Sequence, residues 1–138
     1  MQSQPALFIL MRNDMDSLNP GKAMAQASHA TNDFMRRMES VLPTQRAIFE
    51  NWEKEAGTFG TCLVFAGSEQ QIRTAHASLQ AREVGESRIY SGLTVDPTYP
   101  VRDGEITHLV EIMTCGWLFG DRSTISCALR DIGMSLHP

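Results

Sequence analysis

The sequence predicts an α/β fold: a single-domain three-layer sandwich in which a mixed four-stranded sheet carries helices on both faces. Short apolar runs of strand length alternate along the chain with stretches whose apolar residues recur every three to four positions. The 138 residues suit one core. Since no linker, internal repeat or low-complexity segment divides the chain, we expect a single domain over residues 1–138.

The first half of the chain is expected to contain two strands and two helices. The apolar run 6–12 predicts a buried strand, and a loop then leads into a long helix over about 20–38. A second helix is expected from about 44 to 56, with Gly57 closing it in the left-handed conformation. The apolar run 61–66 predicts a second buried strand.

The second half is expected to add one helix, two strands and a final helix. Ser68 begins the third helix, because it stands three residues before a glutamine in the capping-box pattern. The extended run 88–95 should end before the segment 96–100, whose two prolines argue against a regular strand interior. A fourth strand is expected over 106–113 and a terminal helix over 122–132.

Composition narrows the classes of function. No apolar run approaches the ~20 residues of a membrane span, and the amino-terminal residues do not resemble a signal peptide, so a cytoplasmic protein without a membrane partner is expected. Cys62, Cys115 and Cys127 are widely spaced and odd in number, which favours reduced core thiols. No residues show zinc spacing, so we expect neither metal nor cofactor. The net charge of −4 argues against a general nucleic-acid coat but leaves a local basic patch open.

The long helix should present two distinct faces. Its apolar face combines small residues and Phe34 with neighbouring methionines that are core or a dimer contact: Ala23, Ala27, Ala30, Phe34, Met24, Met35 and Met38. Its second face is a polar stripe: Lys22, Gln26, His29 and Asp33. Lys22 lies in the first turn, where the helix dipole disfavours a cation. We therefore expect Lys22 to hold an anion beside the free N–H groups of the helix end.

The segment from Gly21 to Ala30, Gly-Lys-Ala-Met-Ala-Gln-Ala-Ser-His-Ala, resembles the signature Gly-Lys-x-Ala-Ala-Gln-Cys-Ser-His-Ala of the type II (archaeal/eukaryotic-type) peptidyl-tRNA hydrolases. Trp52 resembles the tryptophan near the end of that family's second helix, and Asp96 falls on its aspartate. The resemblance implies a metal-free esterase that cleaves the ester between a peptide and the ribose of tRNA. It also implies tRNA as a partner and a homodimer.

The resemblance and the chemistry of ester hydrolysis together give each candidate residue a role. Lys22 would be the electrostatic group, Asp96 the carboxylate that orients water, and Thr98 a supporting hydroxyl. The candidate substrate-binding residues are Gly21, Gln26, His29, Arg12 and Tyr99. Further cations that would hold tRNA phosphates are Arg36, Arg37, Arg88 and Arg102.

An alternative function stays open at this point. Pro97 and Thr98 replace the family's Ala-Gly, and Pro100 stands in place of its threonine. This altered loop favours a non-catalytic member of the fold that binds RNA or a protein partner. For His29, a structural role is the alternative to catalysis, and for Tyr99 the alternative to stacking on a base is packing in a turn. A phosphate-binding loop of the Gly-x4-Gly-Lys-Ser/Thr type is excluded because Asp16 occupies its first glycine position.

Overall fold

A five-stranded mixed sheet forms the centre of the protein in the computed structural model, which describes residues 4–41, 43–84 and 87–138. The strand order is β5-β6-β1-β2-β7; β1 and β2 run parallel and the other neighbours are antiparallel. The bounds are β1 (Pro5–Arg12), β2 (Cys62–Gly67), β5 (Tyr90–Asp103), β6 (Ile106–Asp121) and β7 (Ser135–Leu136). The predicted number of four strands was wrong, because the sheet has a fifth strand, β7. Its two residues are too few to form a recognisable hydrophobic pattern in the sequence.

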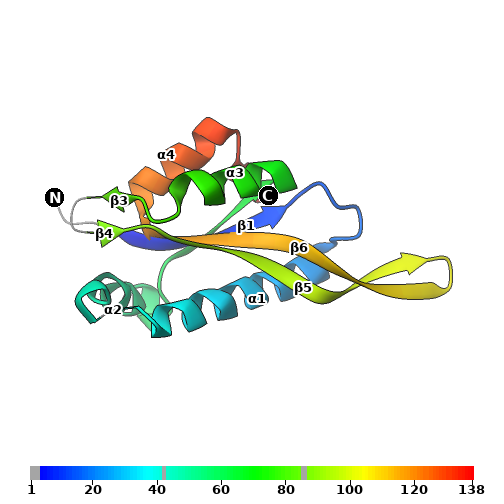
Figure 1. Ribbon diagram of the computed structural model, residues 1–138, viewed down its shortest axis with the longest axis horizontal. Helices are drawn as coiled ribbons and strands as arrows, with labels where there is room; N and C mark the ends of the chain where they lie inside the picture. The colour runs from blue at the N-terminus through cyan, green and yellow to red at the C-terminus, as the bar shows by residue number, and fades with distance from the viewer. Residues whose placement is uncertain (1–3, 42, 85–86) are drawn as a thin grey trace.

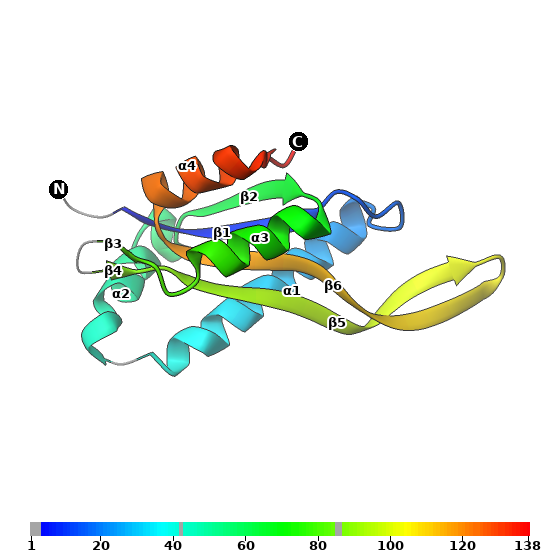
Figure 2. The ribbon, with the colours of Figure 1, turned by 45° about the horizontal axis from the view of Figure 1, so that its top comes forward.

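Helices cover both faces of this sheet, as predicted (Figure 1). Helices α1 (Pro20–Glu39) and α2 (Ala47–Glu53) lie on one face, and α3 (Glu69–Leu79) and α4 (Arg122–Ile132) lie on the other (Figure 2). The remaining elements are short: the 3₁₀ turns η1 (Pro43–Gln45) and η2 (Ala56–Thr58), and a hairpin of β3 (Glu83–Val84) and β4 (Ser87–Arg88). The three-layer sandwich is therefore confirmed.

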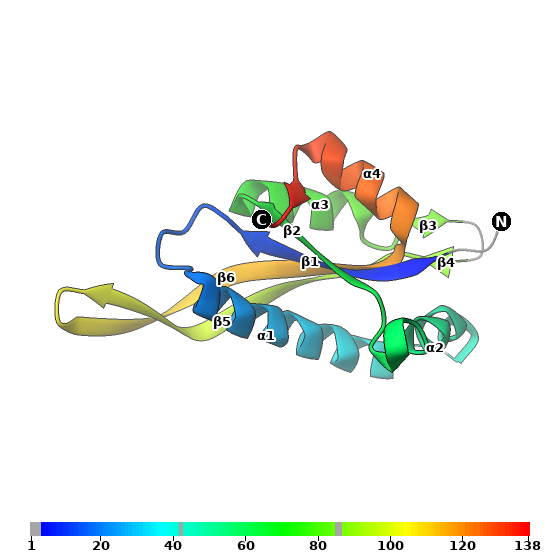
Figure 3. The same cartoon turned by 180° about the vertical axis from the view of Figure 1, so that it is seen from behind.

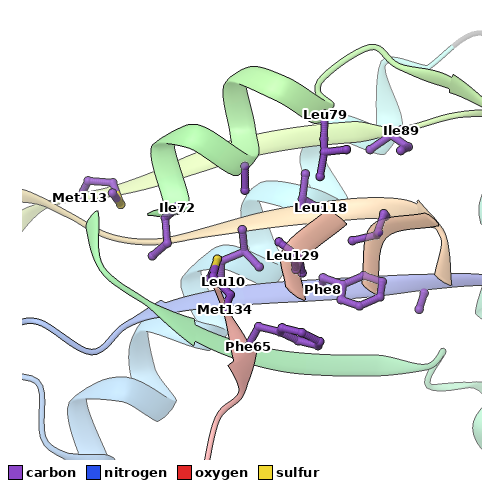
Figure 4. Packing of buried hydrophobic residues seen from close by; sticks show 13 residues of the cluster. Phe8, Leu10, Phe65, Ile72, Leu79, Ile89, Met113, Leu118, Leu129 and Met134 are labelled. Carbon is purple, nitrogen blue, oxygen red and sulfur yellow. The ribbon is translucent and has the colours of Figure 1, made fainter. Parts of the chain in front are cut away.

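Strand β1 supplies both hydrophobic cores because its side chains alternate between the two faces of the sheet. Phe8 and Leu10 join the core beneath α3 and α4 (Figure 4). Leu7 and Ile9 join the core beneath α1 and α2, where Phe34 packs edge-on against Trp52 at 5.3 Å between ring centroids. A strand buried on both faces explains why run 6–12 is apolar throughout rather than alternating.

Helix α1 begins as expected, since Asn19 Oδ1 accepts a hydrogen bond from the Lys22 N–H at 2.9 Å. Its apolar face is buried through Ala30, Phe34 and Met38. Two of its methionines are not core residues, since Met24 is 70% exposed and Met35 is 37% exposed. Both side chains are exposed because they point away from the face of α1 that packs on the sheet. For these two, the predicted alternative of a dimer contact stays a prediction.

The second predicted helix, over 44–56, is replaced by a 3₁₀ turn and the shorter α2. Gly57 has the expected positive φ of 68°, but it lies in η2, beyond the end of α2 at Glu53. Ending the helix early lets the chain turn back toward β2, so that the Trp52 indole N–H donates to the Thr61 carbonyl at 2.7 Å. Tertiary packing of Trp52 therefore overrides the local helical pattern.

Both strands of the second half are longer than predicted. Strand β5 continues through Pro97 and Pro100 to Asp103, because it is an edge strand and its register shifts at Thr94/Val95 and Asp96/Tyr99. Strand β6 runs on past Met113 to Asp121. The far end of this hairpin projects beyond the body of the sheet (Figure 3).

The cysteines differ from the expectation of three core thiols. Cys115 on β6 is buried, whereas Cys62 on β2 and Cys127 on α4 are exposed. All three are free thiols. Cys62 begins its strand, and Cys127 lies on the outer side of an amphipathic helix, so neither position reaches a core.

Candidate functional site

The amino-terminal half of α1 meets the bulged part of β5, and a carboxylate lies at this contact. Gln26 Nε2 donates to Asp96 Oδ2 at 2.7 Å. The other carboxylate oxygen, Oδ1, accepts from the Thr98 backbone N–H at 2.8 Å and from the Thr98 hydroxyl at 3.4 Å. The register shift between Asp96 and Tyr99 provides the turn in which Thr98 can reach back. Both oxygens of Asp96 are therefore fixed in place.

Lys22, one helical turn before Gln26 on α1, also contacts β5. Its Nζ donates to the Pro100 carbonyl at 3.0 Å and lies 5.0 Å from the centre of the Tyr99 ring. Lys22 and Gln26 share one face of α1, so the two side chains contact successive parts of β5. Among the described residues no ion pair joins Lys22 to Asp96. The two charged groups thus share one site while each keeps its own hydrogen-bond partners.

Gln26 is itself held by a hydrogen bond from β6, the strand that pairs with β5. It is 4% exposed, and its Oε1 accepts a 2.7 Å hydrogen bond from the hydroxyl of Thr114, a fully buried residue on β6. With Thr114 donating to Oε1, the amide must turn its NH₂ group toward Asp96. Thr114 is not among the residues predicted for the site. The signal for it in the sequence is a hydroxyl residue within an otherwise apolar stretch of strand.

The electrostatic environment keeps Asp96 ionised. Burial raises the pKa of Asp96, but the Gln26 hydrogen bond, the Thr98 hydrogen bonds and the nearby His29 together lower it below its ordinary value. A carboxylate with a low pKa is negatively charged at neutral pH and is a weak proton acceptor. The geometry therefore suits Asp96 to orienting a water molecule rather than to storing its proton.

In the structure Tyr99 is packed in the interior, which was the alternative to stacking on a base. Its ring is fully buried, and its hydroxyl lies 3.2 Å from Ser17 Oγ, in the loop before α1. In this position the Tyr99 ring packs under the Lys22 ammonium group, and it has no face open to a nucleobase. Gly21, by contrast, lies exposed at the helix start, where an added Cβ would meet just Asn19 Oδ1, at 3.5 Å.

His29 borders a hollow of about 360 Å³ between α1 and β5. The hollow shares Asp96 and Thr98 with the cluster around Gln26 and extends along α1 away from Lys22. The residues that line it are His29, Asn32, Asp33, Arg36, Thr94, Val95, Asp96, Pro97 and Thr98. Asp33 is tied to the sheet through Oδ2, which accepts from the Thr94 hydroxyl at 2.9 Å.

Arg12 lies on the opposite face of the sheet. It follows Leu10 on the α3 side by the alternation of β1. Its guanidinium pairs with Asp14 at 2.8 Å and Glu69 at 3.6 Å, and it donates to the Met113 carbonyl at 3.0 Å. The structure therefore does not bring Arg12 together with Lys22 and Asp96.

The described part of the chain holds no candidate for a metal site or for a membrane-spanning helix. Across residues 4–41, 43–84 and 87–138, no three His, Cys, Asp or Glu side chains gather in a way that would hold a metal ion. Within the same ranges, none of the helices combines the length and the apolar character that a membrane crossing requires.

The chain is similar to a known protein family. The family model described as "Peptidyl-tRNA hydrolase PTH2" matches residues 6–100, which is more than half of the chain. No curated protein matches the chain significantly. The matched residues include Lys22, Gln26, Asp96 and Thr98, whereas Thr114 and the projecting end of the hairpin lie beyond the match.

Proposed function

Because the chain belongs to the PTH2 family of peptidyl-tRNA hydrolases, we propose that it cleaves the ester between a peptide and the ribose of tRNA. The observation that carries the proposal is that Lys22 and Asp96 lie at neighbouring points of one α1–β5 contact, each positioned by its own hydrogen bonds. Family membership supports hydrolase chemistry in general.

Ester hydrolysis needs a positioned water, stabilisation of the carbonyl oxygen and a proton for the leaving ribose oxygen. In the proposed reaction, Asp96 accepts a hydrogen bond from the attacking water, and the Thr98 hydroxyl helps to hold that water. The Lys22 ammonium stabilises the negative charge that develops on the carbonyl oxygen. The carbon–oxygen ester bond then breaks and one proton of the water passes to the ribose oxygen. The peptide acid loses the other proton to solvent, so that a peptide carboxylate and free tRNA remain.

A hydrogen bond holds Lys22 in the site before substrate arrives, which supports this role. Its Nζ donates to the Pro100 carbonyl, which uses one of its three N–H donors. The remaining donors are available to an anionic oxygen. An ammonium fixed before substrate arrives loses less conformational freedom when the charge develops.

A second candidate function is a non-catalytic RNA-binding or protein-binding module. The observation in its favour is that Pro97, Thr98 and Pro100 replace the family's residues in the loop beside Asp96. The homodimer also remains a proposal. The exposed Met24 on the outer side of α1 offers apolar surface for a second copy, and light scattering of the purified chain tests it.

The deciding experiment measures release of peptide from purified N-blocked aminoacyl-tRNA by wild type, Lys22→Ala and Asp96→Asn. We expect each variant to lose about 10²-fold or more in kcat, the usual scale for removing charge stabilisation or acid–base help. Lys54→Ala and Asp103→Asn are matched controls at exposed positions and should retain wild-type turnover.

The outcomes separate the two candidate functions. Turnover that both site variants abolish, with unchanged circular dichroism, supports the hydrolase and both roles. Folded wild-type protein that binds tRNA without releasing peptide supports the binding module instead. Turnover that survives Lys22→Ala and Asp96→Asn alike would place the chemistry elsewhere on the molecule.

A further inference from the structure

The hollow between α1 and β5 continues the candidate site in one direction. It shares Asp96 and Thr98 with that site. Its α1 residues, His29, Asn32 and Arg36, follow one another along the helix away from Lys22. A group bound in the hollow would therefore lie directly beside an ester held at Asp96, on the side opposite Lys22.

Arg36 is a free cation in this hollow. Among the described residues its side chain forms no hydrogen bond or ion pair, whereas the Asp33 side chain, one turn earlier, accepts a hydrogen bond from Thr94. Arg36 lines the hollow, and the preferred direction of long side chains on a helix, back toward its amino terminus, brings an arginine here toward the level of Asn32. A guanidinium in such a position suits a phosphate, which it can bind through two parallel hydrogen bonds.

The other lining groups suit the rest of a nucleotide. The Asn32 amide carries both donors and acceptors, and Asp33 keeps Oδ1 free to accept from a ribose hydroxyl or an exocyclic amine. Val95 and Pro97 are exposed and offer apolar contact to a base. The negative charge of Asp96 keeps a phosphate away from that end of the hollow, which leaves the end at Arg36 for it.

We propose that the hollow holds the 3′-terminal nucleotide of the RNA, with its 5′-phosphate on Arg36 and its acylated ribose toward Asp96. This inference rests on the proposed function, because it takes the ester at Asp96 as its fixed point. It adds a direction: the RNA strand leaves the site along α1, toward the carboxyl end of the helix. The peptide then lies on the Lys22 side.

Binding of adenosine 5′-monophosphate to the full chain tests this subsite without any need for hydrolysis. Amide chemical shifts are followed by NMR while the nucleotide, adenosine or inorganic phosphate is added. We expect the nucleotide to shift the amides of Asn32 and Thr98 and to bind more tightly than adenosine. Arg36→Gln should weaken nucleotide binding about tenfold, the scale of losing one hydrogen-bonded charge contact, and leave adenosine binding unchanged.

Arg130→Gln is the matched control, because Arg130 is also an arginine in the last turn of a helix, is exposed and does not line the hollow. It should leave nucleotide binding within twofold of wild type. An equal loss in both variants would mean general attraction by positive charge and would overturn the proposal. Nucleotide binding no tighter than adenosine binding, or no shift at Asn32 and Thr98, would overturn it too.

The subsite and the hydrolase fail in different ways. If peptidyl-tRNA is cleaved and Arg36→Gln leaves KM unchanged, the subsite is wrong and the hydrolase stands. If no peptide is released but nucleotide binding depends on both the phosphate and Arg36, the subsite stands and the chain is a binding module. If both stand, Arg36→Gln raises KM with little change in kcat, the result expected for a contact equally strong in substrate and transition state.

Discussion

Gln26 and Asp96 are joined across the contact of α1 and β5 by a hydrogen bond of 2.7 Å. Thr114 on β6 donates to the oxygen of the Gln26 amide, so the NH₂ group of that amide faces Asp96. Three elements thus cooperate to position one carboxylate. The chain of contacts runs from the buried hydroxyl through the buried amide to the surface of the site. Changes at its inner members should therefore be detectable at Asp96.

Replacing Gln26 by leucine should raise the pKa of Asp96. The hydrogen bond to Gln26 favours the ionised carboxylate, so without it the effect of burial, which raises the pKa of Asp96, is opposed by the Thr98 hydrogen bonds and His29 alone. Carboxyl carbon NMR across an acid titration measures the change directly. Gln70→Leu, at an exposed position of α3, serves as control, and an unshifted Asp96 in Gln26→Leu would contradict this role of the amide.

Replacing Thr114 by valine should destabilise the fold by about 1–3 kcal/mol, because it leaves the buried Gln26 Oε1 without its donor. The amide also loses the contact that sets its orientation, so peptide release should fall together with stability. Urea unfolding gives the free-energy change. Thr107→Val, at an exposed position of the same strand, should stay within about 0.5 kcal/mol of wild type; equal effects at both positions would rule out the buried hydrogen bond as the cause.

Asp14 should contribute stability that acid removes. The hydrogen bond from Arg12 holds the pKa of Asp14 below its ordinary value of 3.8, against the opposing effect of burial. A carboxyl with a lowered pKa in the folded state stabilises the protein above its ordinary pKa, and that stability is lost as pH falls through the folded-state value. Asp14→Asn should therefore lower the free energy of unfolding at pH 7 and leave it nearly unchanged near pH 2.

Urea unfolding at several pH values measures this dependence. Asp16→Asn, in the same loop and exposed, is the control, since Asp16 forms no hydrogen bond or ion pair with any described residue. A constant difference between wild type and Asp14→Asn at all pH values would mean that Asp14 acts through packing and not through its charge.

Gly60 and Gly104 should respond differently to alanine. Both have positive φ, 77° and 61°, so each alanine variant carries a left-handed strain of about 1–2 kcal/mol. An added Cβ at Gly104 meets nothing within 4 Å, whereas at Gly60 it would overlap the Trp52 indole ring. Gly60→Ala should therefore cost a further 1–3 kcal/mol or so and change the near-ultraviolet circular dichroism of the tryptophans. Equal losses in thermal unfolding would mean that backbone strain alone acts at Gly60.

The sequence determined the elements whose signals are local. Helix α4 occupies the predicted residues, with Asp121 accepting from the Thr124 N–H and Gly133 in the left-handed conformation. The capping box of Ser68 and Gln71 is present. Such features depend on residues three or four positions apart, so the pattern and the structure carry the same information.

The tertiary structure decided what depends on partners far apart in the chain. Strand β5 passes through two prolines because its place at the sheet edge leaves one side without a neighbour, and no local pattern records that place. Thr114 and Gln26 are 88 positions apart, and their hydrogen bond exists because β6 runs beneath α1. The sequence thus supplied the candidate residues of the site, while long-range pairing decided which of them meet.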